Sequence, residues 1–380
     1  MIPYRPERIV VQEEACNDAT THEMLRRLHG VPTSTVRDVD SLLPELRAAS
    51  DFRTTAKRTL ILMRNRGSFM KKCPGAGAEI CCNYFVINYA LNCHLECTYC
   101  ILQSFLNNPA VIIYTNIDDL MREVEEKVQS APGRVFRIGT GETADSLALD
   151  DITSYSHCLV PLFRSLPNAV LELKTKSAQV ANLRTLDHGG HTVISWSLNP
   201  ERIIRKEELK TATLEERLDA ARQCREWGFR VGFHFDPLIY YEGWERDYEE
   251  VVHEIFRHVD PEGICWISLG CLRFTPDLKD IVRRRFPGSS VPYGEFVPGS
   301  HGKQRYFRPI RQEMYSRMRA WIGEHAPQVF VYLCMENRAV WEESIGQAPS
   351  SSDELAAKMD LLAGINPDGS SPCFGAEETL

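Results

Sequence analysis

Six short apolar runs alternate with helix-like segments through the middle of the chain, and this alternation restricts the fold more than any other feature. Strands separated by helices predict parallel pairing, right-handed crossovers and a sheet covered on both faces. Six units are too few for a closed eight-stranded barrel, so we expect an α/β fold with a partial (β/α)6 TIM-like barrel. The strand-like runs are residues 84–89, 135–138, 169–174, 192–198, 230–235 and 264–269. The helical patterns lie near residues 117–129, 152–166, 179–186, 214–228 and 248–258.

The sequence before these units predicts a separate part. Residues 1–80 are expected to form an N-terminal lead-in that is mostly helical, and residues 81–270 are expected to form the barrel. The expected helices of the lead-in lie near residues 21–28, 41–50 and 55–64.

After residue 270, prolines and glycines interrupt the periodic pattern. Two short runs, 293–297 and 304–307, flank the turn-like sequence 298–302 and predict a β-hairpin. The rest of this C-terminal extension, residues 271–380, is expected to contain a helix at 312–325, a strand at 329–333 and a polar tail.

Composition is that of an ordinary cytoplasmic globular protein. Of 380 residues, 43% are hydrophobic and 25% are charged. No apolar run approaches the ~18 residues that a membrane span needs, and the first residues lack the apolar stretch of a signal peptide. The 13 cysteines of such a chain indicate metal or redox chemistry rather than disulfides.

The net charge of −8 conceals two basic segments. Residues 52–72 contain seven Lys or Arg and no acidic residue, and residues 273–320 contain eleven against four. An acidic body with two basic segments is the pattern of a localised surface that binds a polyanion such as DNA. Solvated helix faces are the alternative explanation.

Cys93, Cys97 and Cys100 form a CxxxCxxC trio directly after the first expected barrel strand. Parallel α/β folds carry their chemistry on loops after the carboxyl ends of strands, so this position favours a functional site. Three thiolates can hold three irons of a [4Fe-4S] cluster and leave the fourth iron open to a small molecule. A zinc site would need a fourth Cys or His, and His94 is too close in sequence to supply it comfortably. Buried or incidental cysteines are the remaining alternative.

The trio resembles the motif of the radical S-adenosylmethionine (radical SAM) superfamily. The resemblance implies a partial barrel, a [4Fe-4S] cluster, and S-adenosyl-L-methionine (SAM) chelating the open iron through its amine and carboxylate. It implies that one electron, from a reducing partner such as flavodoxin or ferredoxin, splits SAM into methionine and a 5′-deoxyadenosyl radical. Tyr99, between the last two cysteines, is the aromatic residue that the superfamily pattern prefers beside the adenine.

Polar residues after later strands are candidates for contacting SAM. Gly141 and Glu142 stand where many superfamily members have a Gly-Gly-Glu that contacts the methionine ammonium, although a helix-capping turn would explain them too. Lys176 is a candidate partner for the SAM carboxylate, and Ser197 for the ribose. Ser177 and Asn199 could equally be helix N-caps.

His234 and Asp236 share one face of the fifth expected strand by period two. They are candidates for substrate contact or for a hydrogen-bonded structural pair. Cys73, Cys81 and Cys82 precede the trio, and adjacent cysteines rarely ligate one metal without strain. Apolar packing or a thiol near the active site is therefore favoured over a second cluster.

Beyond the superfamily, the chain resembles the spore photoproduct lyase family of DNA repair enzymes. The matching segments are residues 73–75, 81–84, 92–103, 175–176, 241–244, 305–306 and 330–336. The resemblance implies that the adenosyl radical abstracts a hydrogen atom from a thymine-dimer photoproduct in damaged duplex DNA, after the lesion is flipped out. It also implies that a C-terminal hairpin wedges into the duplex, and the residues expected to contact DNA there are Lys303, Arg305, Tyr306 and Arg308.

Two positions depart from the family pattern. Glu142 stands where the family has its hydrogen-donor cysteine, and Ile101 stands where it has a relay tyrosine. Neither side chain donates a hydrogen atom under mild conditions, so another thiol or Tyr99 would substitute, or the lesion would differ. Ala144 stands where the family offers a hydroxyl towards SAM, and Glu142 would take over that contact.

The main functional hypothesis is thus a radical SAM lyase that repairs a UV photoproduct in DNA, with Tyr99 and Glu142 as candidate catalytic residues. One alternative is a radical SAM enzyme acting on a modified nucleoside, RNA or a peptide. The other is an iron–sulfur protein that binds nucleic acid without turnover.

Overall fold

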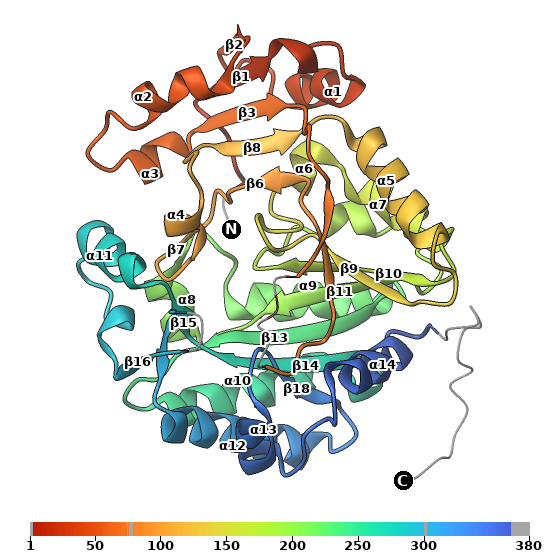
Figure 1. Cartoon of the computed structure of the whole chain (residues 1–380), viewed down its shortest axis with the longest axis vertical. Coiled ribbons are helices and arrows are strands. Elements are labelled where there is room, and N and C mark those ends of the chain that lie inside the picture. Colours follow the sequence, from red (N-terminus) through yellow and green to blue (C-terminus); the bar gives the residue numbers. More distant parts are fainter. Residues whose placement is uncertain (1–2, 74, 76–78, 300–301, 366–380) are drawn as a thin grey trace.

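The computed structural model describes residues 3–73, 75, 79–299 and 302–365. All six expected strands are present and lie side by side in parallel within one curled sheet, so the prediction of a partial barrel is confirmed (Figure 1). They are β5 (Phe85–Ile87), β9 (Phe136–Gly139), β10 (Ala169–Thr175), β11 (Thr192–Ser197), β13 (Arg230–Leu238) and β14 (Ile264–Cys271).

Two further strands extend this sheet to eight. β18 (Val331–Leu333) pairs in parallel with β14, and β4 (Met70–Lys72) pairs antiparallel with β5. Every residue of β11 and β14 is buried, which is the continuous burial expected of parallel strands covered on both faces.

Helices cover the sheet as the periodic patterns predict. α5 (Ile117–Gln129) buries Ile117, Leu120, Val124 and Val128, the i, i+3, i+4 spacing of one helix face. The other expected covering helices are α7 (Ser156–Arg164), α9 (Leu214–Glu226) and α10 (Trp244–His258). In Figure 1, α5 and α7 lie at the right of the sheet, and α10 lies below it with α12 (Arg308–His325) and α13 (Arg338–Ile345).

Two expected helices differ from the prediction. The pattern at 152–166 is interrupted, because Ser154 adopts a left-handed conformation (φ 49°) and ends α6 (Asp150–Thr153) before α7 begins. The pattern at 179–186 contains only a single 3-10 turn, η3 (Ala181–Leu183).

The lead-in, expected to be mostly helical, combines helices with strands, and a second, five-stranded sheet organises this part of the chain. Two of its strands, β8 (Val111–Tyr114) and β6 (Ala90–Leu91), come from beyond residue 80, so that boundary does not separate this layer from the rest. The segment 55–64, expected to be helical, joins the short helix α3 (Phe52–Ala56) to a buried strand. The lead-in strands are β1 (Arg8–Gln12), β2 (Thr33–Val36) and β3 (Thr59–Met63).

Burial explains the difference at β3. Leu60, Ile61 and Leu62 are all fully buried, because β3 pairs in parallel with β1 on one side and β8 on the other. Consecutive apolar residues read as either a buried helix or a central strand, and only the neighbouring strands decide between the two. Helices found near the other two expected positions are α1 (Ala19–Arg27) and α2 (Leu43–Leu46).

The predicted C-terminal hairpin is confirmed outside its tip. β16 (Phe296–Pro298) pairs antiparallel with β17 (Gln304–Tyr306), and β15 (Arg273–Phe274) pairs with the other edge of β17. Residues 300 and 301 of the expected turn lie outside the described residues. The extension also contains α11 (Pro276–Arg285), η5 (Val291–Tyr293) and α14 (Ser352–Leu362). A search of the described residues reveals no helix with the length and apolar character of a membrane span.

Candidate active site

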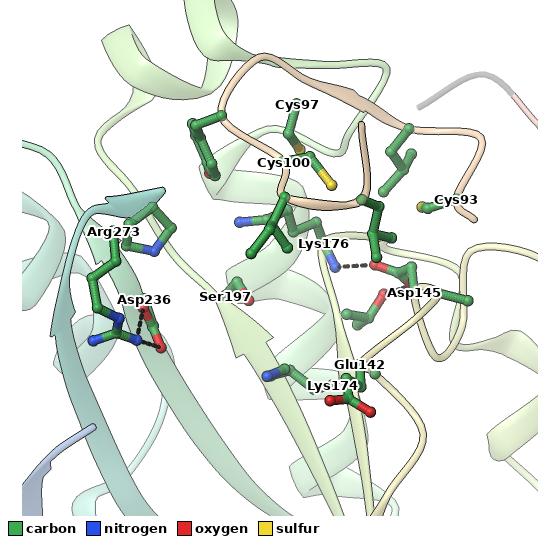
Figure 2. Close-up of a pocket in the computed structure, with 18 of the residues that line it drawn as sticks. Cys93, Cys97, Cys100, Glu142, Asp145, Lys174, Lys176, Ser197, Asp236 and Arg273 are labelled. Carbon is green, nitrogen blue, oxygen red and sulfur yellow. Dashed lines mark hydrogen bonds and ion pairs between the residues drawn. The ribbon is translucent and has the colours of Figure 1, made fainter. Parts of the chain in front are cut away.

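A cavity of about 320 Å³ lies at the carboxyl ends of the barrel strands, and we call it the barrel-mouth cavity. Its walls combine the cysteine loop with residues that follow four successive strands and the C-terminal extension (Figure 2). The fold therefore brings together nearly all the site residues expected from sequence. Those that line the cavity are Cys93, Cys97, Tyr99, Cys100, Gly141, Glu142, Lys176, Ser197 and Lys303.

A short antiparallel strand pair on the side away from the cavity fixes the cysteine loop. β7 (Glu96–Cys97) pairs with β12 (Glu208–Leu209), and the Thr98 N–H donates to the carbonyl of Glu207 at 2.8 Å. The side-chain amide of Gln103 donates to the carbonyls of Cys97 at 3.1 Å and Thr98 at 2.8 Å. These bonds fix the backbone of the loop, so its side chains are presented to the cavity.

The donor set fits a cluster held by three protein thiolates. Cys93, Cys97 and Cys100 are free thiols that lie along one edge of the cavity (Figure 2). Burial raises the pKa of the Cys93 thiol to about 12, so a metal bound there would displace a proton. Within the part of the chain that the structure describes, no three His, Cys, Asp or Glu side chains gather closely enough to hold a single metal ion.

Glu208 lies behind the cavity wall and binds two residues of that wall, Lys176 and Tyr99, and sequence reasoning missed it. Its fully buried carboxylate accepts hydrogen bonds from Lys176 Nζ at 2.9 Å, from Asn199 Nδ2 at 2.8 Å and from the hydroxyl of Tyr99. Arg217, also fully buried, donates to the other oxygen at 2.6 Å. Burial alone opposes ionisation of Glu208, but Lys176 and Arg217 outweigh it and lower the pKa of this carboxyl.

These contacts change the expected roles of two residues. Lys176 lines the cavity, but its ammonium is already paired with Glu208. Tyr99 lines the same cavity with its hydroxyl turned towards Glu208 and with the Lys176 ammonium 5.8 Å from its ring centroid. No local signal in the sequence identifies Glu208, because its partners lie in other parts of the chain.

Asp145 is a second polar residue of the cavity wall that sequence reasoning missed. Its carboxylate accepts hydrogen bonds from the hydroxyl of Thr175 at 2.6 Å and from the backbone N–H of Lys176 at 2.7 Å. It also caps its own loop through the N–H groups of Leu147 and Ala148. Asp145 therefore joins the loop after β9 to the end of β10. The only sequence signal for this residue is its position in a loop, three residues beyond Glu142. Asp is common in turns, so that position does not distinguish it.

Glu142 and Lys174 both line the cavity and are drawn next to one another in the lower part of Figure 2. Burial raises the pKa of the Glu142 carboxyl, and the positive charges of Lys174 and Lys71 oppose this rise. Gly141 lies beside them with little free space, since a Cβ there would stand 3.2 Å from both the Lys174 carbonyl and Ser146 Oγ.

His234 and Asp236 both point to the inner side of β13, as the two-residue period predicts, but they lie at different depths of the barrel. His234 lies in the barrel interior, where Nε2 is 2.8 Å from Glu172 Oε1, so it is the structural member of the pair. Asp236 lines the cavity instead and faces Arg273, with Oδ2 3.4 Å from Nη2. The neighbouring strands repeat this arrangement, since Lys174 and Ser197 line the cavity two residues beyond the inward-facing Glu172 and Ser195.

Two of the four residues expected to contact DNA are buried and serve the fold. Arg305 pairs with Glu336 at 2.7 Å and with Glu79 at 3.1 Å, which neutralises its charge. Tyr306 is 1% exposed, and its ring stacks on Phe296 with centroids 4.6 Å apart. Both are therefore corrected from DNA contacts to anchors of the hairpin. Lys303 lines the cavity, and Arg308 is exposed at the start of α12.

Comparison with known proteins gives one family. A family model described as spore photoproduct lyase matches residues 4–333. The spore photoproduct lyase of Geobacillus sp. (strain Y412MC61) is 25% identical over 256 residues, which cover 65% of this chain and 75% of that protein. The spore photoproduct lyase of Bacillus subtilis (strain 168) is 24% identical over 244 residues, which cover 63% of this chain and 69% of that protein.

Solved structures share the fold. A mutant of spore photoproduct lyase superposes with a TM-score of 0.79 and 24% identity, over 87% of this chain and 100% of that chain. Another mutant, with bound AdoMet and dinucleoside spore photoproduct, superposes with a TM-score of 0.78 and 23% identity over the same shares.

Proposed function

We propose that this chain, which belongs to the spore photoproduct lyase family, is a radical SAM enzyme that repairs a UV-induced pyrimidine dimer photoproduct in DNA. The observation that carries the proposal is the convergence of three free thiols and a polar wall on one cavity at the carboxyl ends of the barrel strands. The bound AdoMet and dinucleoside photoproduct of one similar structure support the same assignment of ligands.

The cofactor site is assigned to residues of the cavity wall. Cys93, Cys97 and Cys100 would provide three thiolates to a [4Fe-4S] cluster, which leaves one iron for SAM. When bound, the cluster and SAM supply a 5′-deoxyadenosyl radical after one electron arrives from a carrier such as flavodoxin or ferredoxin.

The polar wall around the thiols is arranged to receive a zwitterionic ligand. Glu208, Lys176 and Arg217 together carry one net positive charge beside the cysteine loop, and Lys176, the member that lines the cavity, would present it to a ligand carboxylate. Gly141 lets its loop pack closely against Lys174 and Ser146, while Glu142 and Ser197 offer polar contacts to a ligand from neighbouring strands. The aromatic ring of Tyr99 gives the adenine a flat surface.

The return of a hydrogen atom to the substrate requires a donor other than residue 142, because Glu142 has no thiol. Tyr99 is bound to Glu208, which favours a thiol over this hydroxyl. Two thiols adjoin charged residues of the cavity wall. Burial raises the pKa of Cys73 to about 11, and the charges of Glu142, Lys174 and Asp236 also act on this thiol. The Sγ of Cys334 lies 4.0 Å from Arg273 Nη2.

Anaerobic reconstitution followed by reaction with dithionite, SAM and UV-irradiated oligonucleotides tests the proposal. We expect 5′-deoxyadenosine together with loss of the photoproduct and recovery of unmodified thymines, measured by mass spectrometry. Formation of 5′-deoxyadenosine without any change in irradiated DNA would indicate a different substrate. Absence of 5′-deoxyadenosine with every reductant would instead support an iron–sulfur protein that binds nucleic acid without turnover.

A further inference from the structure

Five of the large apolar side chains exposed in the described part of the chain belong to segments on the carboxyl-end side of the barrel strands or to the C-terminal extension. Phe105 ends α4 (Leu102–Phe105) after the cysteine loop, Leu209 belongs to β12 beside that loop, Tyr240 follows β13, and Tyr293 and Phe307 belong to the C-terminal extension. Such a gathering of exposed apolar groups marks an interaction site. The residues are Phe105, Leu209, Tyr240, Tyr293 and Phe307.

One other large apolar residue in the described part of the chain is exposed, Leu361 on α14. It lies at the opposite end of the barrel, because the neighbouring Leu362 carbonyl accepts a hydrogen bond from Arg230, the first residue of β13. Figure 1 agrees, with α14 at the right of the view and β15 and β16 at the left. Leu361 therefore provides a matched exposed apolar residue away from the cavity.

Tyr240 contacts the buried ring of Tyr306, and Phe307 is the next residue after Tyr306 in the sequence. The backbone N–H of Tyr240 donates to the Tyr306 hydroxyl at 3.1 Å, and the two rings lie 6.1 Å apart. Phe307 is the next residue after Tyr306 and precedes α12. Tyr240 is 40% exposed and Phe307 is 46% exposed, so two aromatic side chains lie at the surface next to Tyr306, one through a ring contact and one through the chain.

Positive charge accompanies these rings. Residues 296–308 contain Lys303, Arg305 and Arg308 and no acidic residue. Arg305 is neutralised by Glu336 and Glu79, whereas Lys303 and Arg308 form no ion pair with any residue that the structure describes. Nearby, the Arg202 guanidinium lies 5.1 Å from the ring centroid of Tyr241.

We propose that Tyr240 and Phe307, flanked by Lys303 and Arg308, form a stacking platform for bases that lose their partners when the duplex opens at the lesion. This inference rests on the proposed function and specifies which residues bind the opened DNA. Aromatic faces beside unpaired cations are the features that bind unstacked bases and their phosphates. A fully paired helix offers no base faces to such rings, so the platform selects opened DNA.

The experiment compares binding of three probes by the reconstituted full-length protein. The probes are a duplex with a two-base bubble that carries 2-aminopurine, the same duplex fully paired, and a single strand. Base–aromatic stacking predicts that Phe307→Ala and Tyr240→Leu each weaken bubble binding about tenfold and reduce quenching of 2-aminopurine. Tyr240→Phe keeps the ring and should bind as the unsubstituted protein does. Leu361→Ala is the matched control and should change nothing.

Salt dependence separates stacking from charge. Arg308→Ala should lower the slope of log K against log salt by about 1, while Phe307→Ala should leave the slope unchanged. The platform would be refuted if Phe307→Ala and Tyr240→Leu bound the bubble as tightly as Leu361→Ala does, with thermal unfolding unchanged. The exposed rings would then be assigned to binding a protein partner. Repair of the isolated dinucleotide photoproduct by the unsubstituted protein is measured separately. Absence of this repair would contradict the proposed function, whereas the binding measurements would still test the platform.

Discussion

Glu208 holds the ammonium of Lys176 at 2.9 Å inside the protein, where neither the carboxylate nor its second cation, Arg217, is exposed. The backbone of Glu208 also pairs with that of Cys97. One residue thus connects the cysteine loop with the end of β10. We infer that Glu208 is a positioning residue, since it sets where the thiols and Lys176 lie relative to one another.

Replacing Glu208 should destabilise the protein strongly. Glu208→Ala leaves the fully buried Arg217 without its carboxylate, and loss of one partner of a buried ion pair costs about 3–5 kcal/mol. Urea unfolding of the metal-free protein measures the loss. The control is Glu226→Ala, which removes an exposed pair with Arg222 and should cost less than about 1 kcal/mol. Equal costs for the two variants would contradict the assigned role of Glu208.

Replacing Cys97 should abolish cluster formation. Cys97→Ala removes one of three thiolates on the cavity wall, and two thiolates are too few to retain the cluster. Iron and sulfide analysis with electron paramagnetic resonance after anaerobic reconstitution measures the result. Cys224→Ala, at a buried thiol of α9 outside the cavity, should keep full iron content. Full iron in Cys97→Ala would refute the assignment of this ligand.

The hairpin arginines should respond differently to charge reversal. Arg308→Glu should weaken duplex binding and reduce its salt dependence, because Arg308 is exposed and has no carboxylate partner among the described residues. Arg305→Glu should instead lower the free energy of unfolding by several kcal/mol, since it places a third carboxylate beside Glu336 and Glu79. Filter binding at several salt concentrations and urea unfolding measure the two effects. An unchanged salt slope for Arg308→Glu would remove this residue from the DNA surface.

Glu172 should make the protein sensitive to acid. Burial opposes ionisation of this carboxyl, but the charge of His234, hydrogen bonds from His234 and Ser195, and the charge of Lys174 together lower its pKa. A carboxyl whose pKa is lowered by folding contributes stability above its unfolded pKa of about 4.5, and this stability is lost as the pH falls below that value. Glu172→Gln should therefore be less stable at pH 7 and show a flatter acid dependence between about pH 5 and pH 3.

The urea midpoint as a function of pH measures this prediction. Glu226→Gln, at an exposed carboxyl, should follow the unsubstituted protein over the whole range. Parallel pH curves for Glu172→Gln and the unsubstituted protein would show that Glu172 titrates alike in the folded and unfolded states.

Local pattern was sufficient for the barrel and the cysteine motif. The six strands and the trio are encoded within short stretches, because the side chains that define them are neighbours in sequence. The carboxyl-end rule then placed Gly141, Lys176 and Ser197 at one cavity without knowledge of their contacts. The lead-in was harder, because an apolar run such as Thr59–Met63 fits a helix or a central strand equally well.

The amino-acid sequence by itself determined the parallel architecture, the cluster motif and the departure from a thiol at residue 142. Only the tertiary structure decided which charged side chains remain free to bind a ligand or DNA and which are neutralised by ion pairs inside the protein. Arg305 and Glu336 are 31 positions apart, and Tyr99 and Glu208 are 109 apart. Pairing over such separations has no local period, so a basic residue at the surface and one neutralised in the interior look identical until the chain is folded.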